Sequence, residues 1–359
     1  MEAVIHSSSV VLFVIVTVLL SKWFNNLLEW QLQYAEEQES LQILQLFPER
    51  KIDELCSEET FYCFVITDAY NNETGRPLAF RRLRLKGPDG VLILSNARLL
   101  VPKPMSYKNL DTRKWELDKT TVRLTYARMM ISGIFFSEGV EYNSPKVSNI
   151  LIFGLGGGVI NNYLSVMPGQ KLNITVVDID PVMKTVAEKW YGFVETDMHR
   201  IVVEDGVKFI KKDQDLKYNA ILVDLCSNER GPLLCPIEAF LKDDVISNLN
   251  YNLVDTGVLI VNIITPPAGF EAVSQRILKR YEEHFTFCVL LPSGAHDRML
   301  FCFKYHPWNN DPNRLHQNVL RMDQELGFHL KDGVHRNEFL ILLLETDVVT
   351  SLPKVAHRS

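Results

Sequence analysis

The chain lacks the cysteine and histidine spacing of a metal site. Its six cysteines stand at positions 56, 63, 226, 235, 288 and 302, and none forms a CxxC pair or a zinc-type Cys/His cluster. We therefore predict no metal site. An even count permits disulfides, but the chain is large and the spacing is irregular, so free thiols in a reducing compartment are the expectation.

A basic excess is also missing. The 359 residues include 38 Lys and Arg against 44 Asp and Glu, which gives a formal net charge of -6. Nucleic-acid-binding domains usually present a basic stripe, so we expect no nucleic-acid partner. The composition, 47% hydrophobic and 23% charged, is that of a folded chain with one sizeable core.

Long hydrophobic runs are nearly absent. The exception, VVLFVIVTVLL at 10–20, has eleven residues, whereas a bilayer span needs roughly 20. Lys22 and Trp23 follow it in the manner of an interfacial anchor. A membrane anchor is the favoured interpretation, with a cleaved signal peptide or a buried helix as alternatives. The anchor predicts a single-pass membrane protein with its main domain in the cytosol, as opposed to a secreted or a cytoplasmic protein.

Composition and turn signals divide the chain into regions. Apolar residues at helical spacing before Pro48 predict a connecting helix, and short strand-like runs separated by NNETGRP and GPDG predict a β unit. The expected regions are an anchor or signal segment (1–24), a connecting helix (25–57), a small N-terminal antiparallel β unit (58–104), the main domain (115–306) and a C-terminal extension (307–359).

From Val147 onward, apolar strand-like runs alternate with helical segments. Five such β–α units are followed by two strand-like runs with no helix between them. Near-continuous apolar strands fit a sheet that is buried on both faces. We therefore predict an α/β fold: a doubly wound, mostly parallel, seven-stranded Rossmann-like sheet with an antiparallel edge strand. The segment 120–139 is expected to form a helix before it.

The stretch LIFGLGGGVI at 151–160 places Gly154, Gly156 and Gly158 between the first of these strands and a helix. Glycines there allow a tight turn and the close approach of a ligand to backbone N–H groups. A βα turn without a ligand is the alternative. The run reads GxGGG, not GxGxxG, and no Walker lysine follows it.

Carboxylates stand at the ends of the next three strands. Asp178 lies 24 residues after the first glycine, where it can accept the hydroxyls of a ribose. Asp205 could reach an adenine amino group, with Gly206 freeing the turn, and Asp224 ends the fourth strand. Asp180 precedes a proline and is expected to cap a helix. This edge favours S-adenosylmethionine over NAD as the cofactor.

The order of these motifs resembles a known family. GLGGG, VVDIDP, VVEDG and ILVD are similar to the spermidine-synthase-like branch of the class I methyltransferases. FRRLRLKGPDGVLILSNARL, DLCSNERGPLLCP and RMLFCFKYHP resemble more closely the carboxyl-terminal half of the methyltransferase-like protein 13 family, the elongation factor 1-alpha lysine and N-terminal methyltransferases. The resemblance covers about 58–345.

This resemblance implies an enzyme that uses S-adenosylmethionine to methylate a protein amine, a lysine or an N-terminus. A protein substrate is then the expected partner, and a homodimer stays open. The implied catalytic residue is Asp224, beside the transferred group, where its carboxylate could orient the amine. The implied cofactor-binding residues are Gly154, Gly156, Gly158, Asp178, Asp205 and Gly206.

Two alternatives remain. True spermidine synthases transfer an aminopropyl group to a polyamine and carry a D-S-S-D-P-type loop with two carboxylates. Here the loop reads DLCS, so that Ser227 stands where the second carboxylate is expected, and the upstream helix lacks the Tyr-His-Glu cluster. The other alternative is a catalytically silent methyltransferase fold that serves as an interaction module, which the departure at Cys226 and Ser227 keeps open.

Overall fold

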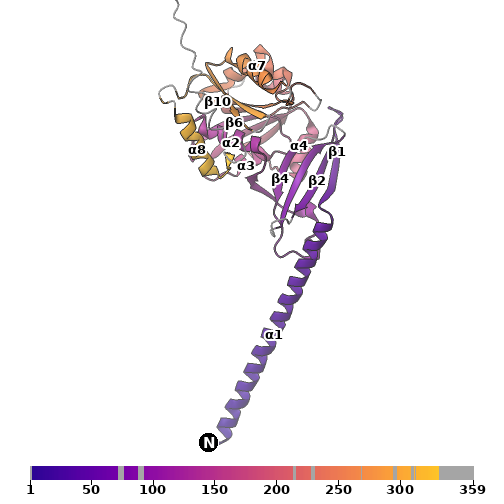
Figure 1. The fold of residues 1–359 in the computed structure, drawn as a ribbon. Coiled ribbons are helices and arrows are strands. Elements are labelled where there is room, and N and C mark those ends of the chain that lie inside the picture. The colour runs from indigo at the N-terminus through magenta and orange to yellow at the C-terminus, as the bar shows by residue number, and fades with distance from the viewer. Residues whose placement is uncertain are drawn as a thin grey trace, which may run out of the picture. The chain divides into compact units, whose positions relative to one another are not determined.

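The fold is known from a computed structural model of the whole chain (Figure 1). It describes residues 2–71, 77–87, 93–212, 216–227, 231–267, 269–293, 297–308, 311 and 313–330. The strand-like run EFLILLLE, which the sequence places in the C-terminal extension, lies outside the described residues. The chain forms two compact units, one of residues 1–50, 68–80 and 99–116 and the other of residues 51–67, 81–98 and 117–359.

Helix α1 (Glu2–Leu46) takes up both the apolar run and the expected connecting helix, and it ends just before Pro48. Within its own unit, the Glu36 carboxylate accepts a hydrogen bond from the backbone N–H of Tyr107 (3.1 Å). In the described part of the chain, no helix combines the length and apolar character that a bilayer crossing requires. The predicted membrane anchor and single-pass localisation are therefore wrong. Eleven helical residues rise only about 16 Å, roughly half of the hydrocarbon core.

The predicted antiparallel β unit is confirmed as a five-stranded sheet with strands in sequential order. Its strands are β1 (Glu49–Cys56), β2 (Cys63–Asn71), β3 (Leu78–Leu85), β4 (Ile93–Leu99) and β5 (Leu117–Val122). Two of these, β1 and β5, add to the runs that the sequence indicated. The helix expected from residue 120 begins at Thr125, because the β-branched Thr120, Thr121 and Val122 complete β5 instead.

The predicted seven-stranded sheet is also confirmed, with the order β11-β12-β10-β9-β6-β7-β8. Its strands are β6 (Val147–Phe153), β7 (Lys171–Asp178), β8 (His199–Val203), β9 (Tyr218–Val223), β10 (Leu253–Ile264), β11 (Phe287–Pro292) and β12 (Asp297–Phe303). Pairings among β6, β7, β8, β9 and β10 are parallel. Strand β12 is antiparallel to both β10 and β11, so that the antiparallel strand is second from the edge and not at it.

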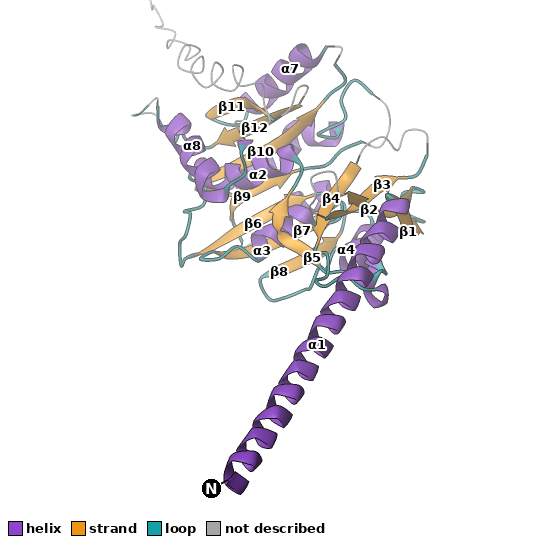
Figure 2. Cartoon of the chain, turned by 60° about the horizontal axis from the view of Figure 1, so that its bottom comes forward, coloured by secondary structure: helices purple, strands orange, loops and turns teal. Residues whose placement is uncertain are grey.

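Helices cover both faces of this sheet (Figure 2). The helices are α2 (Thr125–Phe136), α3 (Val159–Ser165), α4 (Pro181–Trp190), α5 (Gly206–Lys211), α6 (Asp243–Asn252), α7 (Phe270–Glu282) and α8 (Arg314–Leu326). Short 3-10 turns are η1 (Tyr107–Asn109), η2 (Thr112–Lys114) and η3 (Glu238–Leu241). Because side chains alternate along a strand, Ile150 and Ile152 face α2, α3, α4 and α8, whereas Leu151 and Phe153 face α5, α6 and α7.

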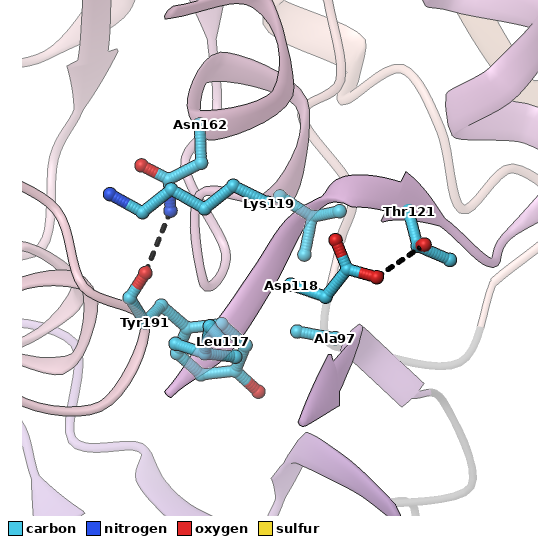
Figure 3. Close-up of a pocket in the computed structure, with 8 residues that line it drawn as sticks. Ala97, Leu117, Asp118, Lys119, Thr121, Asn162 and Tyr191 are labelled. Atoms are coloured by element: carbon cyan, nitrogen blue, oxygen red, sulfur yellow. Dashed lines mark hydrogen bonds between the residues drawn. The ribbon is translucent and has the colours of Figure 1, made fainter. Parts of the chain in front are cut away.

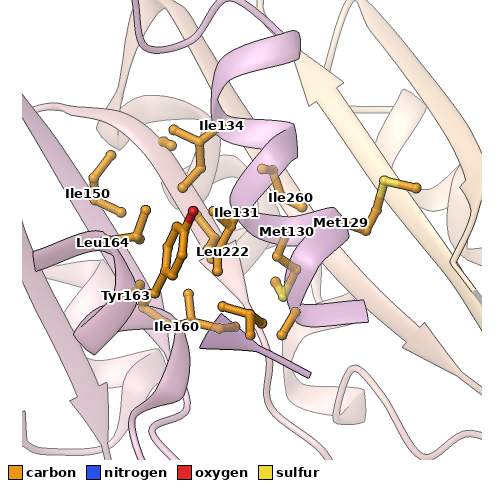
Figure 4. Packing of buried hydrophobic residues seen from close by; sticks show 14 of the residues in the cluster. Met129, Met130, Ile131, Ile134, Ile150, Ile160, Tyr163, Leu164, Leu222 and Ile260 are labelled. Carbon is orange, nitrogen blue, oxygen red and sulfur yellow. The ribbon is translucent and has the colours of Figure 1, made fainter. Parts of the chain in front are cut away.

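Helix α2 is held firmly against the sheet. Met130 and Ile134 are fully buried and belong to one cluster with Ile150 of β6, Leu222 of β9 and Ile260 of β10 (Figure 4). Burying an aliphatic side chain of this size contributes about 1.5–3 kcal/mol. This packing fixes the first turn of α2, which reaches the carboxyl edge of the sheet.

All six cysteines are paired, which corrects the expectation of free thiols. The disulfides join Cys56 to Cys63, Cys226 to Cys235 and Cys288 to Cys302. Cysteines 7, 9 and 14 positions apart give no pairing signal in sequence, because folding alone decides whether they meet. Cys288 and Cys302, for example, are directly opposite each other in the β11–β12 pair.

Candidate functional site

A cavity of about 410 Å³ lies within the second unit, at the carboxyl ends of β6, β7, β9 and β10. The chain runs outward through β6, β7 and β8 and then returns to place β9 on the other side of β6. Open α/β sheets bind ligands at such a reversal, because the loops diverge there and leave a crevice. The cavity volume is within the usual range of ligand pockets, about 300–1,000 Å³.

The glycine loop, residues 154–158, contributes Gly154 and Gly156 to the lining of this cavity. Gly154 and Gly156 both have positive φ, +92° and +51°, which side chains rarely adopt. A Cβ atom at Gly154 would stand 2.3 Å from the backbone oxygen of Asp224, so that glycine permits the close packing of β6 against β9. Ser95 of β4 supports the same loop, since its Oγ accepts a hydrogen bond from the Gly157 N–H (2.8 Å).

Asp178 ends β7 beside the loop and lines the cavity. Its Oδ2 accepts a hydrogen bond from the backbone N–H of Leu155 (2.8 Å), and its Oδ1 accepts one from the N–H of Asp180 (2.9 Å). Burial raises the pKa of Asp178 to about 6, although these two hydrogen bonds favour the charged form. Within the described part of the chain, both hydrogen bonds that orient this carboxylate come from the backbone.

Asp180 is the N-cap of α4, as predicted. Its Oδ1 accepts a hydrogen bond from the N–H of Val182 (2.9 Å), and Pro181 opens the helix. Its Oδ2 accepts a further hydrogen bond from the Thr60 hydroxyl (2.7 Å). Both residues line the cavity, so this contact joins the turn before β2 to the rim of the site.

Asp224 follows β9 on the other side of the loop. Asn262 Nδ2, from β10, donates a hydrogen bond to its Oδ1 (2.9 Å), and the Tyr126 hydroxyl, from the first turn of α2, also hydrogen-bonds its carboxylate. Burial raises the pKa of Asp224 to about 6, while both partners act to lower it. The pKa of Tyr126 is raised well above its usual value by burial and by the nearby Asp224 charge, so the phenol stays protonated.

No family model matches the chain. Over 256 residues it is 27% identical to the human eEF1A lysine and N-terminal methyltransferase. The aligned region covers 64% of this chain and 35% of that protein. The chain is similar to these methyltransferases. It is also 27% identical over 171 residues to a polyamine aminopropyltransferase of Vibrio vulnificus, which covers 47% of this chain and 53% of that enzyme. The predicted resemblance is confirmed.

A solved structure, human methyltransferase-like protein 13 in complex with SAH, has a TM-score of 0.51 to this chain. It is 23% identical and covers 57% of this chain and 93% of the solved chain, a likeness that shows the fold alone. The chain spans about a fifth to a third of the length of the curated methyltransferases that it matches.

Four predicted site residues meet in the cavity: Gly154, Gly156, Asp178 and Asp224. The other three, Gly158, Asp205 and Gly206, are not among the described residues that line it. The Asp205 carboxylate caps α5, accepting hydrogen bonds from the N–H groups of Val207 (2.7 Å) and Lys208 (3.2 Å). Contact between these three residues and a cofactor stays a prediction.

Sequence reasoning missed the two side chains that hold Asp224. Asn262 is a single polar residue within the apolar strand VLIVNII, and that interruption is a signal that could have found it. Tyr126 lies within a run that the sequence indicated only as helical, and nothing local points to its hydroxyl. Their distances in sequence from Asp224 are large, so only the fold brings the three together.

The described residues fit an adenosyl cofactor. Apolar side chains from different elements, among them Ile179, Met183 and Leu225, line the cavity and could enclose a purine ring beside the Asp178 carboxylate. The side chain of Asn262 is fully buried, and its Oδ1 has no hydrogen-bond partner within the described part of the chain. A buried acceptor of this kind suits an N–H group of a ligand.

A second cavity in the same unit is much smaller, at about 10 Å³, and lies between β5 and α3 (Figure 3). Lys119 Nζ donates a hydrogen bond to the Gly192 carbonyl (2.6 Å), and Asn162 Nδ2 donates one to the Tyr191 carbonyl (2.8 Å). Such a volume is about that of a single water position. This cavity is therefore too small for a cofactor.

Proposed function

We propose that the chain is an S-adenosylmethionine-dependent methyltransferase that acts on a protein amine, a lysine side chain or an N-terminus. The observation that carries the proposal is the half-buried Asp224, hydrogen-bonded by Tyr126 and Asn262 and placed beside a glycine loop at the reversal point of the sheet. The similarity to eEF1A lysine and N-terminal methyltransferases supports the same reaction class and a protein acceptor.

The cofactor-binding residues proposed are Gly154, Gly156 and Asp178, together with Gly158, Asp205 and Gly206. Gly154 and Gly156, which line the cavity with positive φ, expose the loop backbone to a ligand, and Asp178 offers carboxylate oxygens to ribose hydroxyls. When bound, S-adenosylmethionine supplies a methyl group on a positively charged sulfur. The regions proposed are a methyltransferase domain at 115–306 and a β unit at 58–104.

Asp224 is proposed as the catalytic residue. With a pKa of about 6, its carboxylate is mostly ionised at neutral pH and can accept a hydrogen bond from the incoming amine. Its negative charge then offsets the positive charge that develops on the nitrogen during attack. Tyr126 and Asn262 hold the carboxylate in one orientation, so that the amine is positioned in line with the methyl group.

Calorimetry of the full-length chain with S-adenosylmethionine and S-adenosylhomocysteine tests cofactor binding, with a Kd expected in the micromolar range. Transfer of isotope-labelled methyl groups to proteins of a cell extract, read by mass spectrometry, then tests the reaction. We expect labelled lysines or N-termini. The absence of binding to both compounds would contradict the proposal.

The alternatives give other results in the same experiments. Strong preference for decarboxylated S-adenosylmethionine, with transfer to a diamine, would establish the aminopropyltransferase, a reaction class represented by the Vibrio relative. Binding without transfer to any protein or amine would indicate a silent module. Among the described residues that line the cavity, Ser227 follows Asp224 where a second carboxylate would grip a polyamine, which favours the methyltransferase.

A further inference from the structure

The described residues that follow Asp224 in the wall of the cavity belong to no helix or named strand. We call the described residues 225–227 and 231–237 the acceptor segment. Leu225, Cys226 and Ser227 line the cavity directly beside Asp224, and Cys235 lines it from the far end of the segment. On the proposed function, an amine that approaches Asp224 passes along these residues.

The Cys235 end of the acceptor segment is tied to the sheet by several backbone hydrogen bonds. Cys235 is fully buried, and it exchanges two backbone hydrogen bonds with Ile264 at the end of β10 (3.1 and 3.0 Å). Leu234 N–H also donates to the Ile264 carbonyl (2.9 Å). The Cys235 end is therefore a firm anchor that belongs, in effect, to the seven-stranded sheet.

At the other end, the described backbone hydrogen bonds join residues of the segment to one another. Ser227 N–H donates to the Leu234 carbonyl (2.7 Å), and the Leu225 carbonyl accepts from Ile237 N–H (3.1 Å). Cys226 lies between these two bonds, is half-buried, and forms its disulfide with the anchored Cys235. The covalent bond thus transmits the rigidity of β10 to the residues that flank Asp224.

We propose that the Cys226–Cys235 disulfide positions the acceptor segment for the methyl acceptor, and that its reduction by a dithiol lowers methyl transfer without releasing the cofactor. This inference rests on the proposed function. Reduction breaks the S–S bond and leaves two protein thiols. The dithiol supplies two electrons and two protons and becomes a disulfide itself.

The three disulfides differ in their access to a reductant. Cys56 of the Cys56–Cys63 pair is exposed, so a dithiol reaches that bond as well. Cys288 and Cys302 are 8% and 0% exposed in the β11–β12 pair, and neither lines the cavity, so a reductant has little access to them. Cys226, by contrast, faces the cavity through which a small dithiol can enter. The Cys288–Cys302 pair is therefore the matched internal control.

The test compares the double variant Cys226→Ala with Cys235→Ala against the double variant Cys288→Ala with Cys302→Ala. The reduction arm uses the double variant Cys56→Ala with Cys63→Ala, with and without dithiothreitol, because the exposed Cys56–Cys63 bond would otherwise be reduced as well. For the first variant, and for the reduced protein that lacks Cys56 and Cys63, we expect KM for a methyl-accepting peptide to rise at least tenfold, with the Kd for S-adenosylmethionine changed less than threefold. The control variant should keep the wild-type KM. An unchanged KM after loss of the Cys226–Cys235 bond would overturn the inference, as would an equal loss of cofactor binding.

Hydrogen exchange separates this inference from the proposed function. Reduction should speed exchange of the Ser227 amide more than tenfold while amides of β6, such as Ile152, stay protected. Unchanged exchange at Ser227 would contradict the positioning role even if the chain proves active. Faster exchange in a chain that binds no S-adenosylmethionine would instead contradict the proposed function and leave the structural role of the disulfide standing.

Discussion

Two half-buried carboxylates face the same cavity, yet they are held in different ways. Asp178 is oriented by backbone N–H groups within its own loop region. Asp224 is oriented by two side chains, Tyr126 from α2 and Asn262 from β10. On the proposed function, we call Gly154, Gly156 and Asp178 the cofactor half, and Tyr126, Asp224 and Asn262 the acceptor half.

The difference shows in which half a substitution of a neighbouring side chain changes the position or charge of the carboxylate. Backbone N–H groups are present whatever the side chains, so the position of Asp178 is insensitive to changes at its partners Leu155 and Asp180. The position and charge of Asp224 depend on two particular side chains. A fold that keeps its cofactor half can therefore change its acceptor by a few substitutions on other elements.

The largest expected effect is at Asp224. Asp224→Asn keeps the shape of the side chain but removes its negative charge, so we expect the methyl-transfer rate at saturating cofactor to fall about 10²- to 10³-fold. The Kd for S-adenosylmethionine, measured by calorimetry, should change less than threefold. Asp255→Asn is the control, because Asp255 is exposed at the opposite end of β10. Equal loss of binding and rate would show that the two halves are not separable.

Asp178→Asn should give the reverse pattern. Loss of hydrogen bonds from ribose hydroxyls to a charged group costs about 1.5–3 kcal/mol, which corresponds to a Kd for the cofactor raised about 10- to 100-fold. The rate at saturating cofactor should stay near that of wild type. Asp197→Asn, at an exposed carboxylate before β8, is the matched control and should bind normally. A wild-type Kd for Asp178→Asn would remove Asp178 from the proposed site.

The pH dependence separates the halves further. The pKa values of Asp178 and Asp224 are both raised to about 6 by burial, so cofactor affinity and transfer rate should both decline as pH falls through this range. The Tyr126 hydrogen bond lowers the pKa of Asp224. Tyr126→Phe should therefore move the midpoint of the rate profile to higher pH and leave the midpoint for cofactor affinity in place. The positive charge of bound S-adenosylmethionine shifts the midpoint in wild type and in Tyr126→Phe alike. The readout is therefore the difference in midpoint between these two proteins. Movement of both midpoints would contradict the separation.

The smallest effect concerns stability. Because the folded-state pKa of Asp224 lies above its unfolded value, the neutral form stabilises the fold below about pH 4, and this contribution is lost as pH rises through about 6. Asp224→Asn should thus be more stable than wild type at pH 7.5, by no more than about 3 kcal/mol for a pKa raised from 3.8 to about 6, and equal to it near pH 3.5. Denaturant melts at both pH values measure the difference. A variant less stable than wild type at pH 7.5 would contradict the assigned burial cost.

The main sheet and the cofactor half were predictable because their signals are local. Continuous apolar strands that alternate with helices indicated the doubly wound fold, and Asp178 follows the glycine loop closely enough for one βα unit to place both. Strand β5 was missed since its few residues continue directly toward a strong helical pattern. The apolar run at 10–20 wrongly predicted a membrane anchor, because its composition is typical of a membrane span but its length is too short.

The acceptor half was only partly predictable, for the opposite reason. Asp224 could be placed from the end of β9, but Tyr126 and Asn262 approach it from elements 98 and 38 positions away, as residue numbers give. The disulfides escaped prediction in the same way, because pairing depends on the register of strands and not on cysteine spacing. Contacts between residues this far apart in sequence can be identified only once the fold is known.

The contact between Ser95 and the glycine loop carries a thermodynamic consequence. The Ser95 hydroxyl, 62 positions upstream, bonds the Gly157 N–H of the loop. Any ligand that requires the ordered loop is therefore linked to the folding of β4, and saturation with it should slow amide exchange in that strand as well as in β6. Ser95→Ala should weaken this linkage: the strand would still fold, but the ligand would protect it less. The stability of β4 should therefore depend on whether the cavity holds a ligand. A spectroscopic probe placed on β4 would detect ligand binding without contacting the ligand.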